Sequence, residues 1–319
     1  MNPAGLLVID KPKGMTSHDV VDAVRGLYGT RKVGHSGTLD PDATGVLLVG
    51  LGKATRLLAF LQNLPKTYEA HVQFGISTAT QDASGATTSQ APCSFDRDDL
   101  EDATKGFVGE ISQLPPMVSA VKVAGEPLYK AARRGEEVER EPRRVRVYRL
   151  EIKDFDRNGY SASLEVECSS GTYIRTLAHD IGDRLECGAH ITLLRRTSVG
   201  DFSIDGAIGL EALAALTETQ RLAELLSSAE AMRSFPTVIA TESMQADVSH
   251  GRPLPLSVDH SPEGQLPVAS IRSLTGRAPH EVGSQAGVPV AVLDEEGKLL
   301  AVYRKTAKGL KAAAVLEAG

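Results

Sequence analysis

The sequence predicts an α+β protein with a small β-rich module at its C-terminal end. Its 319 residues suffice for a large and a small domain, since a single hydrophobic core stops growing at roughly 250 to 300 residues. Strand and helix patterns alternate without the regular rhythm of βαβ units, which favours an α+β sheet over a doubly wound one. Beyond about Thr241, apolar runs at 288–293 and 298–303 flank a turn and indicate a separate β-rich module.

Strands and helices alternate in the first part of the chain. The apolar run 6–9 predicts a strand, which ends at a loop rich in proline and glycine. Thr16 with Asp19 three residues later has the pattern of a capping box, which predicts the start of a helix. A buried strand over 45–52 and a helix over 54–64 are expected next.

The next elements follow from periodicity and composition. Alternation predicts a strand over 68–75, whose apolar face comprises Tyr68, Ala70, Val72 and Phe74. The segment 77–90 is rich in Thr, Ser, Ala and Gly, which predicts a loop, and 96–108 is expected to be helical.

The second half of the chain has a hairpin signature followed by helices. The runs 145–155 and 161–168 predict paired strands, joined by the turn residues 157–159. Helices are expected over 173–185 and over the Leu- and Ala-rich segment 210–232.

Composition and charge narrow the classes of function. The longest apolar run, 46–51, falls far short of the roughly 18 residues of a membrane span, so no contact with a membrane is expected. Three scattered cysteines indicate a reducing, cytoplasmic setting, and the net charge of -6 argues against a non-specific nucleic-acid coat. The segment 121–150 carries nine basic and five acidic side chains, which fits a solvated surface of ion pairs or a binding patch.

The segment 33–45, Val-Gly-His-Ser-Gly-Thr-Leu-Asp-Pro-Asp-Ala-Thr-Gly, is the strongest indication of function. Its three glycines and one proline exclude a regular helix or strand, yet it lies between apolar segments, as a working loop on a rigid scaffold does. Pro41 restricts the backbone of Asp40 and so sets the direction of its carboxylate. Taken alone, Asp40 fits a turn cap and a catalytic group equally well.

Other chemistries fit this region poorly. The residues 50–55 lack the glycine and hydroxyl spacing of a phosphate-binding loop, and Ser36 lacks the following glycine of a nucleophile elbow. No cysteine pair or histidine pair has the spacing of a zinc site, so no metal is expected.

The loop resembles the catalytic motif of the TruB-type tRNA pseudouridine synthases, which is close to Gly-His-Thr/Ser-Gly-Thr-Leu-Asp-Pro-x-Ala-Thr-Gly. Further motifs of that family occur in the same order over about 6–202: Asp10-Lys11-Pro12-x-Gly14-x-Thr16-Ser17, Lys66-x-Tyr68, Gln113-x-Pro115-Pro116, Ser119-Ala120-x-Lys122-x-x-Gly125-x-Pro127-Leu128-Tyr129, Cys168-Ser169-x-Gly171-Thr172-Tyr173-Ile174-Arg175-Thr176-Leu177, Gly188-Ala189-His190 and Leu193-Leu194-Arg195-Arg196-Thr197. Several independent motifs in one order make a chance match an unreasonable explanation.

The resemblance implies a fold and a division into domains. It implies a pseudouridine synthase fold, with a mixed, largely antiparallel central sheet flanked by helices and loops. The catalytic domain would comprise 1–238, with an insertion at about 116–146 that closes over RNA. A PUA-like RNA-binding domain would comprise 239–319. Neither a cofactor nor a metal is implied.

Three catalytic residues follow from the resemblance. Asp40 corresponds to the aspartate that assists cleavage of the glycosidic bond. Arg175 corresponds to its partner, and a nearby guanidinium favours the ionised carboxylate, so Asp40 is expected to be charged at neutral pH. Tyr68 corresponds to a residue that stacks on the base and is a candidate base for removing a proton from the sugar. Lys11 would only support the loop.

The resemblance also implies substrate-binding residues. His35 would fill the space that the flipped uridine leaves, Tyr173 and Leu194 would line the pocket, and Lys122 would contact the RNA. Flipping is required because the reacting carbon is buried in the folded T-loop.

The implied function is isomerisation of uridine 55 in the T-loop of tRNA to pseudouridine. The expected partner is tRNA, through its T-stem-loop and, for the C-terminal domain, its acceptor end. No obligate protein partner is implied. An alternative is a tRNA-binding folding chaperone that acts without catalysis. The resemblance leaves open whether Asp40 forms a covalent adduct or drives elimination to a glycal, and it leaves the oligomeric state open.

Three positions depart from the family pattern. Ala79 stands where many members carry an aspartate, Asp42 occupies a variable position that is often apolar, and Val118 replaces a common aromatic residue. These departures concern contacts with RNA rather than the reaction.

Overall fold

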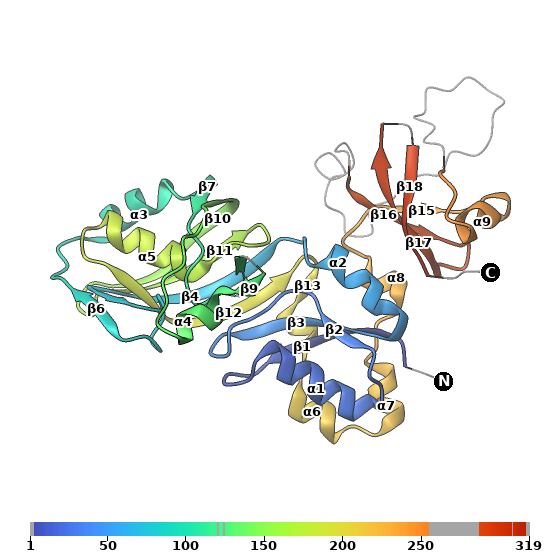
Figure 1. Ribbon diagram of the computed structural model, residues 1–319, viewed down its shortest axis with the longest axis horizontal. Coiled ribbons are helices and arrows are strands. Elements are labelled where there is room, and N and C mark those ends of the chain that lie inside the picture. The colour runs from blue at the N-terminus through green and yellow to red at the C-terminus, as the bar shows by residue number, and fades with distance from the viewer. Residues whose placement is uncertain (1–2, 120, 124, 255–286, 308, 317–319) are drawn as a thin grey trace.

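A large mixed sheet forms the body of the protein. The computed structural model describes residues 3–119, 121–123, 125–254, 287–307 and 309–316 (Figure 1). The strands of the main sheet run in the order β14 (Ile208–Gly209), β1 (Gly5–Lys11), β3 (Thr44–Leu51), β12 (Ala189–Val199), β4 (Lys66–Phe74), β11 (Ser161–Cys168), β10 (Arg143–Asp156) and β7 (Gly109–Gln113). Strand β2 (Val33–His35) pairs with β3, and β13 (Phe202–Ser203) pairs with β12.

The pairing agrees with the expected α+β class. The β14–β1 and β3–β12 pairs are parallel, and the other pairs of neighbours in this order are antiparallel. The sheet is therefore mixed and largely antiparallel, as predicted. The predicted hairpin is confirmed by the pairing of β10 with β11, and the predicted face of β4 is buried at each of its four apolar positions.

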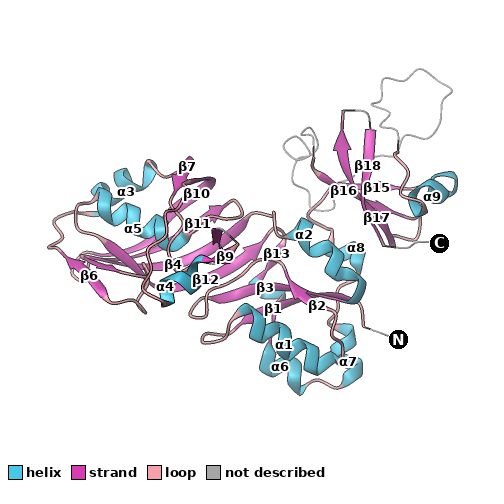
Figure 2. Cartoon of the chain, in the orientation of Figure 1, coloured by secondary structure: helices cyan, strands magenta, loops and turns pink. Residues whose placement is uncertain are grey.

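Helices cover the sheet and the loops at its edges (Figure 2). They are η1 (Gly52–Leu57), η2 (Ile204–Gly206), α1 (Ser17–Tyr28), α2 (Leu58–Leu61), α3 (Arg97–Lys105), α4 (Leu128–Arg133), α5 (Ile174–Arg184), α6 (Leu210–Ala215), α7 (Glu218–Ala223), α8 (Ser228–Ala231) and α9 (Glu242–Ser249). Helix α1 begins where predicted, because the Thr16 side chain accepts from the Asp19 backbone and Asp19 accepts from the Thr16 backbone. No helix of the described chain is long and apolar enough to cross a membrane.

Several parts of the expected secondary structure are wrong. The segment 33–45 is not free of regular structure, because Val33–His35 form β2 and β3 begins at Thr44. The segment 77–90 contains a hairpin of β5 (Ile76–Thr78) and β6 (Thr87–Gln90) instead of a continuous loop. Every residue of β6 is exposed, so no apolar alternation marks it in the sequence. The segment 210–232 forms three short helices, because Thr217 and Ser227 each accept a backbone hydrogen bond at the start of a new helix.

A close backbone approach fixes the strands beneath the candidate site. Gly45 pairs with Arg196 across the parallel contact of β3 with β12. Its φ is 103°, and a Cβ at this position would clash with the Arg196 carbonyl oxygen. Only glycine adopts this φ readily and has no Cβ to clash, so only glycine fits here. This contact places the loop that precedes β3 beside the middle of β12.

The C-terminal part forms a second, smaller sheet. Its strands run in the order β15 (Thr237–Ile239), β16 (Pro289–Leu293), β17 (Leu299–Thr306) and β18 (Gly309–Val315). The expected domain boundary at 238/239 falls within β15, and helix α9 was not expected. One face of this sheet shares a hydrophobic core with β1, η1 and α2, through residues such as Leu293 and Phe60. Figure 1 shows the sheet beside α2 and α8.

Candidate active site

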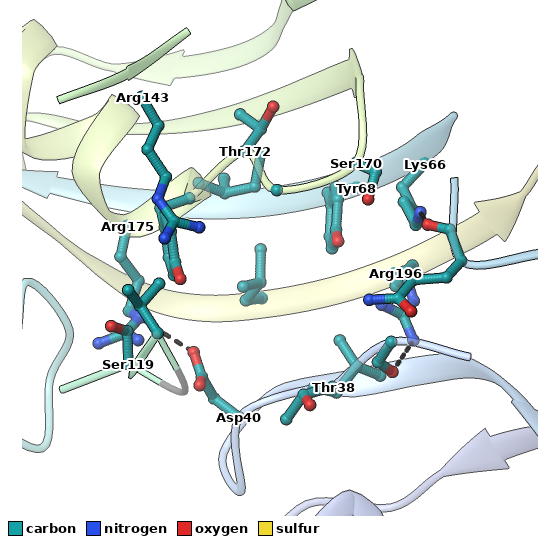
Figure 3. A pocket seen from close by; sticks show the side chains of 18 residues that line it. Thr38, Asp40, Lys66, Tyr68, Ser119, Arg143, Ser170, Thr172, Arg175 and Arg196 are labelled. Carbon is teal, nitrogen blue, oxygen red and sulfur yellow. Dashed lines mark hydrogen bonds and ion pairs between the residues drawn. The ribbon is translucent and has the colours of Figure 1, made fainter. Parts of the chain in front are cut away.

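A cavity of about 530 Å³ lies where the loop before β3 meets β4, β12 and the start of α5. It brings together five of the residues that the sequence predicts for the site: Asp40, Tyr68, Tyr173, Arg175 and Leu194. Figure 3 shows these elements contributing side chains from different sides of the cavity. No cluster of side chains that could hold a metal ion occurs in the described part of the chain.

Two predicted residues are not among those that line the cavity. His35 lies in β2, and its Nδ1 is buried without a hydrogen-bond partner in the described ranges. Burial lowers the pKa of His35, which favours the neutral imidazole. Lys122 lies in β8 (Lys122–Val123), which pairs with β9 (Glu126–Pro127), and its side chain is outside the described residues.

The loop that carries Asp40 is fixed on both sides of this residue. The Ser17 hydroxyl accepts from the Leu39 backbone at 2.9 Å and donates to the Leu39 carbonyl at 3.1 Å. The fully buried Lys11 ammonium donates to the carbonyls of Pro12, Met15 and Pro41 at 2.9, 2.7 and 3.1 Å. Lys11 therefore supports the loop, as expected. These bonds limit the positions that the carboxylate can adopt.

Arg175 holds Asp40 from the opposite side. Its Nε lies 3.0 Å from Oδ2 of Asp40, and its guanidinium also donates at 2.8 Å to the carbonyls of Thr80 and Val118. Nη1 lies 3.4 Å from Oδ2 of Asp82, while Oδ1 of Asp82 accepts from Thr80 and Ser84. The guanidinium is 4% exposed and has few ways to move. Sequence analysis assigned Asp82 no role, although it lies three residues after Ala79, one of the positions that depart from the family pattern.

The net effect on the Asp40 carboxyl is opposite to the expectation from Arg175 alone. Burial raises its pKa, and Arg175 lowers it only in part, while the negative charge of Asp82 raises it further. The Asp40 side chain keeps 42% of its surface exposed, so water limits the rise. Arg175 thus counteracts a desolvation penalty and orients the group.

Tyr68 and Arg196 meet at the floor of the cavity. Tyr68 is buried on β4, and burial raises the pKa of its hydroxyl, while the adjacent guanidinium of Arg196 lowers it in part. Arg196 is 1% exposed and donates to the carbonyl of Val46 at 2.7 Å and to that of Gly37 at 3.5 Å. The tyrosine is therefore protonated at neutral pH, with a cation in place to stabilise its phenolate. Sequence reasoning gave Arg196 no role.

Tyr173 is positioned by a buried glutamine. The Gln113 side chain accepts from the Tyr173 backbone at 2.9 Å and donates to its carbonyl at 3.1 Å. Tyr173 is the residue before α5, so this pair also fixes the start of the helix that carries Arg175. Ser119, which also lines the cavity, lies beside the Tyr173 hydroxyl.

The basic segment 121–150 serves two purposes. Arg134 forms ion pairs with Glu126 and Glu136 at 2.9 and 2.7 Å, as in a solvated surface. Arg143, at the start of β10, instead points into the cavity. The charge excess is therefore partly surface pairing and partly a lining of the site.

Family models match two adjacent stretches of the chain. The "TruB family pseudouridylate synthase (N terminal domain)" matches residues 25–174, and the "tRNA pseudouridylate synthase B C-terminal domain" matches residues 175–233. A "tRNA pseudouridine synthase B" of Syntrophotalea carbinolica is 47% identical over 235 residues, which are 73% of this chain and 76% of that protein. Its counterpart from Mycobacterium sp. (strain KMS) is 44% identical over 284 residues, which are 88% of this chain and 94% of that protein.

Solved structures agree with these matches. A chain in the "Crystal Structure of a Cbf5-Nop10-Gar1 Complex" has a TM-score of 0.74 and 28% identity, covering 98% of this chain and 85% of that one. A chain in the "Structure of H/ACA RNP bound to a substrate RNA containing 2'-deoxyuridine" has a TM-score of 0.71 and 26% identity, covering 99% and 86%. Sequence motifs, fold and family models thus lead to one conclusion: this chain belongs to the TruB family of pseudouridylate synthases.

Proposed function

We propose that this protein isomerises uridine 55 in the T-loop of tRNA to pseudouridine. The observation that carries the proposal is the Asp40 carboxylate, held 3.0 Å from a buried arginine at a cavity lined by two tyrosines. Membership of the TruB family and relatives named tRNA pseudouridine synthase B support tRNA as the substrate. A volume of about 530 Å³ is in the range of sites that enclose small organic groups, as a flipped nucleoside requires.

The reaction needs no net change in composition. The bond from N1 of uracil to C1′ breaks, with its electron pair remaining on the base. The base turns until C5 faces C1′, the C5–C1′ bond forms, C5 loses its proton, and N1 takes one up. Asp40 either attacks C1′ and is later displaced by C5, or stabilises the positive charge at C1′ while a base removes the C2′ proton to give a glycal. On the second route the base returns that proton to C2′ when C5 adds to C1′.

The other side chains suit supporting roles. Tyr68 is the candidate base for the sugar proton, and Arg196 beside it stabilises the phenolate that would result. Tyr173 and Leu194 pack against the flipped base. The position of His35 outside the cavity supports its role as the group that fills the vacated space rather than a catalytic base.

The remaining expectations concern the partner and its contacts. The segment 116–146, with Lys122, closes over the T-stem-loop, while residues 239–319 contact the acceptor end in the cytoplasm. The C-terminal sheet has a core of its own around Tyr303, which supports a distinct domain. Its docking on the catalytic part supports joint binding of one tRNA.

Replacement of Asp40 by Asn tests the proposal. The purified wild-type protein, without added metal or cofactor, should convert uridine 55 in unmodified tRNA, as read by chemical labelling and primer extension. The Asp40→Asn variant should lose at least about 10³-fold in turnover, the scale of removing a central catalytic group, while retaining tRNA binding. Normal turnover by this variant would refute the assignment.

The same variant separates catalysis from the alternative chaperone function. If Asp40→Asn accelerates refolding of tRNA as the wild-type protein does, that activity is independent of catalysis. Loss of both activities would tie refolding to the reaction.

A further inference from the structure

Two buried cations line the cavity at the end opposite Arg175 (Figure 3). Lys66 is 5% exposed and Arg196 is 1% exposed. Within the described part of the chain, neither has a carboxylate oxygen within the 4.0 Å of an ion pair. Burial of a charge is costly unless a counter-charge or a full set of hydrogen bonds compensates. Two such groups side by side therefore require an explanation.

Backbone contacts explain only part of this arrangement. The Lys66 ammonium donates to the carbonyls of Gln62 and Leu64 at 2.5 and 2.6 Å, as lysines often do after a helix such as α2. A neutral donor can make the same two hydrogen bonds, so these bonds by themselves do not require a charge. Arg196 anchors the loop through Gly37 and Val46, which likewise requires hydrogen bonds but no net charge.

The charge balance of the cavity indicates a missing anion. Four cationic side chains line it: Lys66, Arg143, Arg175 and Arg196. The one carboxylate among its described lining residues is Asp40, which is paired with Arg175. The remaining cations give the cavity a net positive charge, and a low-dielectric wall strengthens the attraction for an anion.

We propose that Lys66 and Arg196 form a subsite for a phosphate group of the RNA, next to the reacting nucleotide. The identity of the ligand rests on the proposed function, because a flipped uridine brings its two flanking phosphodiesters to the cavity. Lys66 has a third N–H bond beyond the two that cap the helix turn. Ser170, on the same side in Figure 3, offers a neutral hydroxyl.

The proposed subsite also predicts that Lys66 gains a proton when RNA binds. Burial, together with the positive charge of Arg196, lowers its pKa to about 7, while Cys168 acts in the opposite sense. A phosphate bound to the ammonium favours the protonated form and raises this pKa. Binding of RNA at pH 7.5 therefore takes up protons.

The variants Lys66→Gln and Lys66→Arg test the subsite. Glutamine keeps a donor and removes the charge, whereas arginine keeps the charge. Binding of tRNA should weaken roughly tenfold at low salt in Lys66→Gln, the scale of one hydrogen bond to a charged group. The slope of log affinity against log salt should fall by about 0.7 to 0.9, the value of one phosphate contact. Lys66→Arg and the exposed control Lys105→Gln should keep the slope.

Modified RNA identifies the bound group directly. Stem-loops carry one methylphosphonate beside the target uridine, protected by a 2′-deoxy sugar, with the matched deoxy phosphodiester as the control. One flanking position should weaken binding to the wild-type protein roughly tenfold and have no further effect in Lys66→Gln. If, at both flanking positions, the methylphosphonate weakens binding to Lys66→Gln as much as it weakens binding to the wild-type protein, the two changes are additive and the proposal is overturned.

Two further measurements keep the test decisive. If Lys66→Gln does not fold, the methylphosphonate scan uses the wild-type protein alone, and absence of an effect at both flanking positions contradicts the subsite. Calorimetry in buffers of different ionisation enthalpy measures the proton uptake that accompanies binding. Inorganic phosphate is compared with chloride, at equal ionic strength, as a competitor of RNA binding. If phosphate competes more strongly but the methylphosphonates have no effect, the site binds free phosphate and the RNA proposal is overturned. Wild-type protein that isomerises no uridine would instead contradict the proposed function.

Discussion

The two ends of the cavity hold arginines that are almost equally buried but differ in their partners. At the paired end, Arg175 contacts the carboxylates of Asp40 and Asp82 at 3.0 and 3.4 Å. At the unpaired end, Arg196 contacts backbone carbonyls and lies beside Tyr68 and Lys66. The paired end has its counter-charges within the protein, whereas the unpaired end has none among the residues that the structure describes.

This difference separates orientation from binding. A cation that is already neutralised adds little attraction for RNA, but it fixes the direction of the carboxylate that reacts. A cation without a carboxylate partner has the opposite properties, because its charge is available to a ligand. We therefore expect changes at the paired end to affect turnover, and changes at the unpaired end to affect affinity.

The largest effect that tests this comparison is expected for Arg175→Ala. Loss of its contacts frees Asp40 to move, and misplacement of a reacting group by about 1 Å costs roughly 10²-fold in rate. Single-turnover rates should fall by about that factor, while the affinity for tRNA changes much less. Because Arg175 lowers the pKa of Asp40, its loss should also move the acid limb of the pH profile to higher pH. Equal losses in rate and affinity would show that Arg175 contacts phosphate, and the comparison would fail.

A smaller effect with the opposite pH shift is expected for Asp82→Asn. The negative charge of Asp82 raises the pKa of Asp40, so its removal should move the acid limb to lower pH. The rate should fall about tenfold, the scale of one charge-assisted hydrogen bond, because Arg175 loses one of its anchors. The pH profiles of both variants, measured at saturating tRNA, check the prediction. Shifts in the same direction would show that the two residues do not act on Asp40 through charge.

The smallest effect concerns stability at the unpaired end. The Lys66 pKa is about 7 in the folded protein and 10.5 for the ordinary side chain, so the unfolded state binds more protons between these values. The cost of burying the charge is fully present below pH 7 and is relieved as the pH rises, so the lysine makes stability increase with pH. Lys66→Gln should reduce the gain in free energy of unfolding between pH 7 and 9. Urea denaturation of both proteins measures the difference, and parallel pH curves would contradict a buried lysine whose pKa is lowered.

Sequence reasoning was most successful where local patterns were strong. The capping box at Thr16, the alternating face of β4 and the β10–β11 hairpin are confirmed by the fold. It failed for the β5–β6 hairpin, because exposed strands lack an apolar period, although this hairpin carries part of the support for Arg175. The single helix expected over 210–232 was wrong because serine and threonine caps restart the helix.

The sequence by itself determined the family, the stiff loop around Asp40 and the side chains most suited to chemistry, because motif order and local propensity are written along the chain. Only the tertiary structure decided which of them share a cavity, since the contact of Asp40 with Arg175 depends on packing between distant segments. It also decided the direction of the Asp40 pKa and left Lys66 and Arg196 without carboxylate partners among the described residues. Burial and pairing are properties of the folded surroundings, and no single segment contains them.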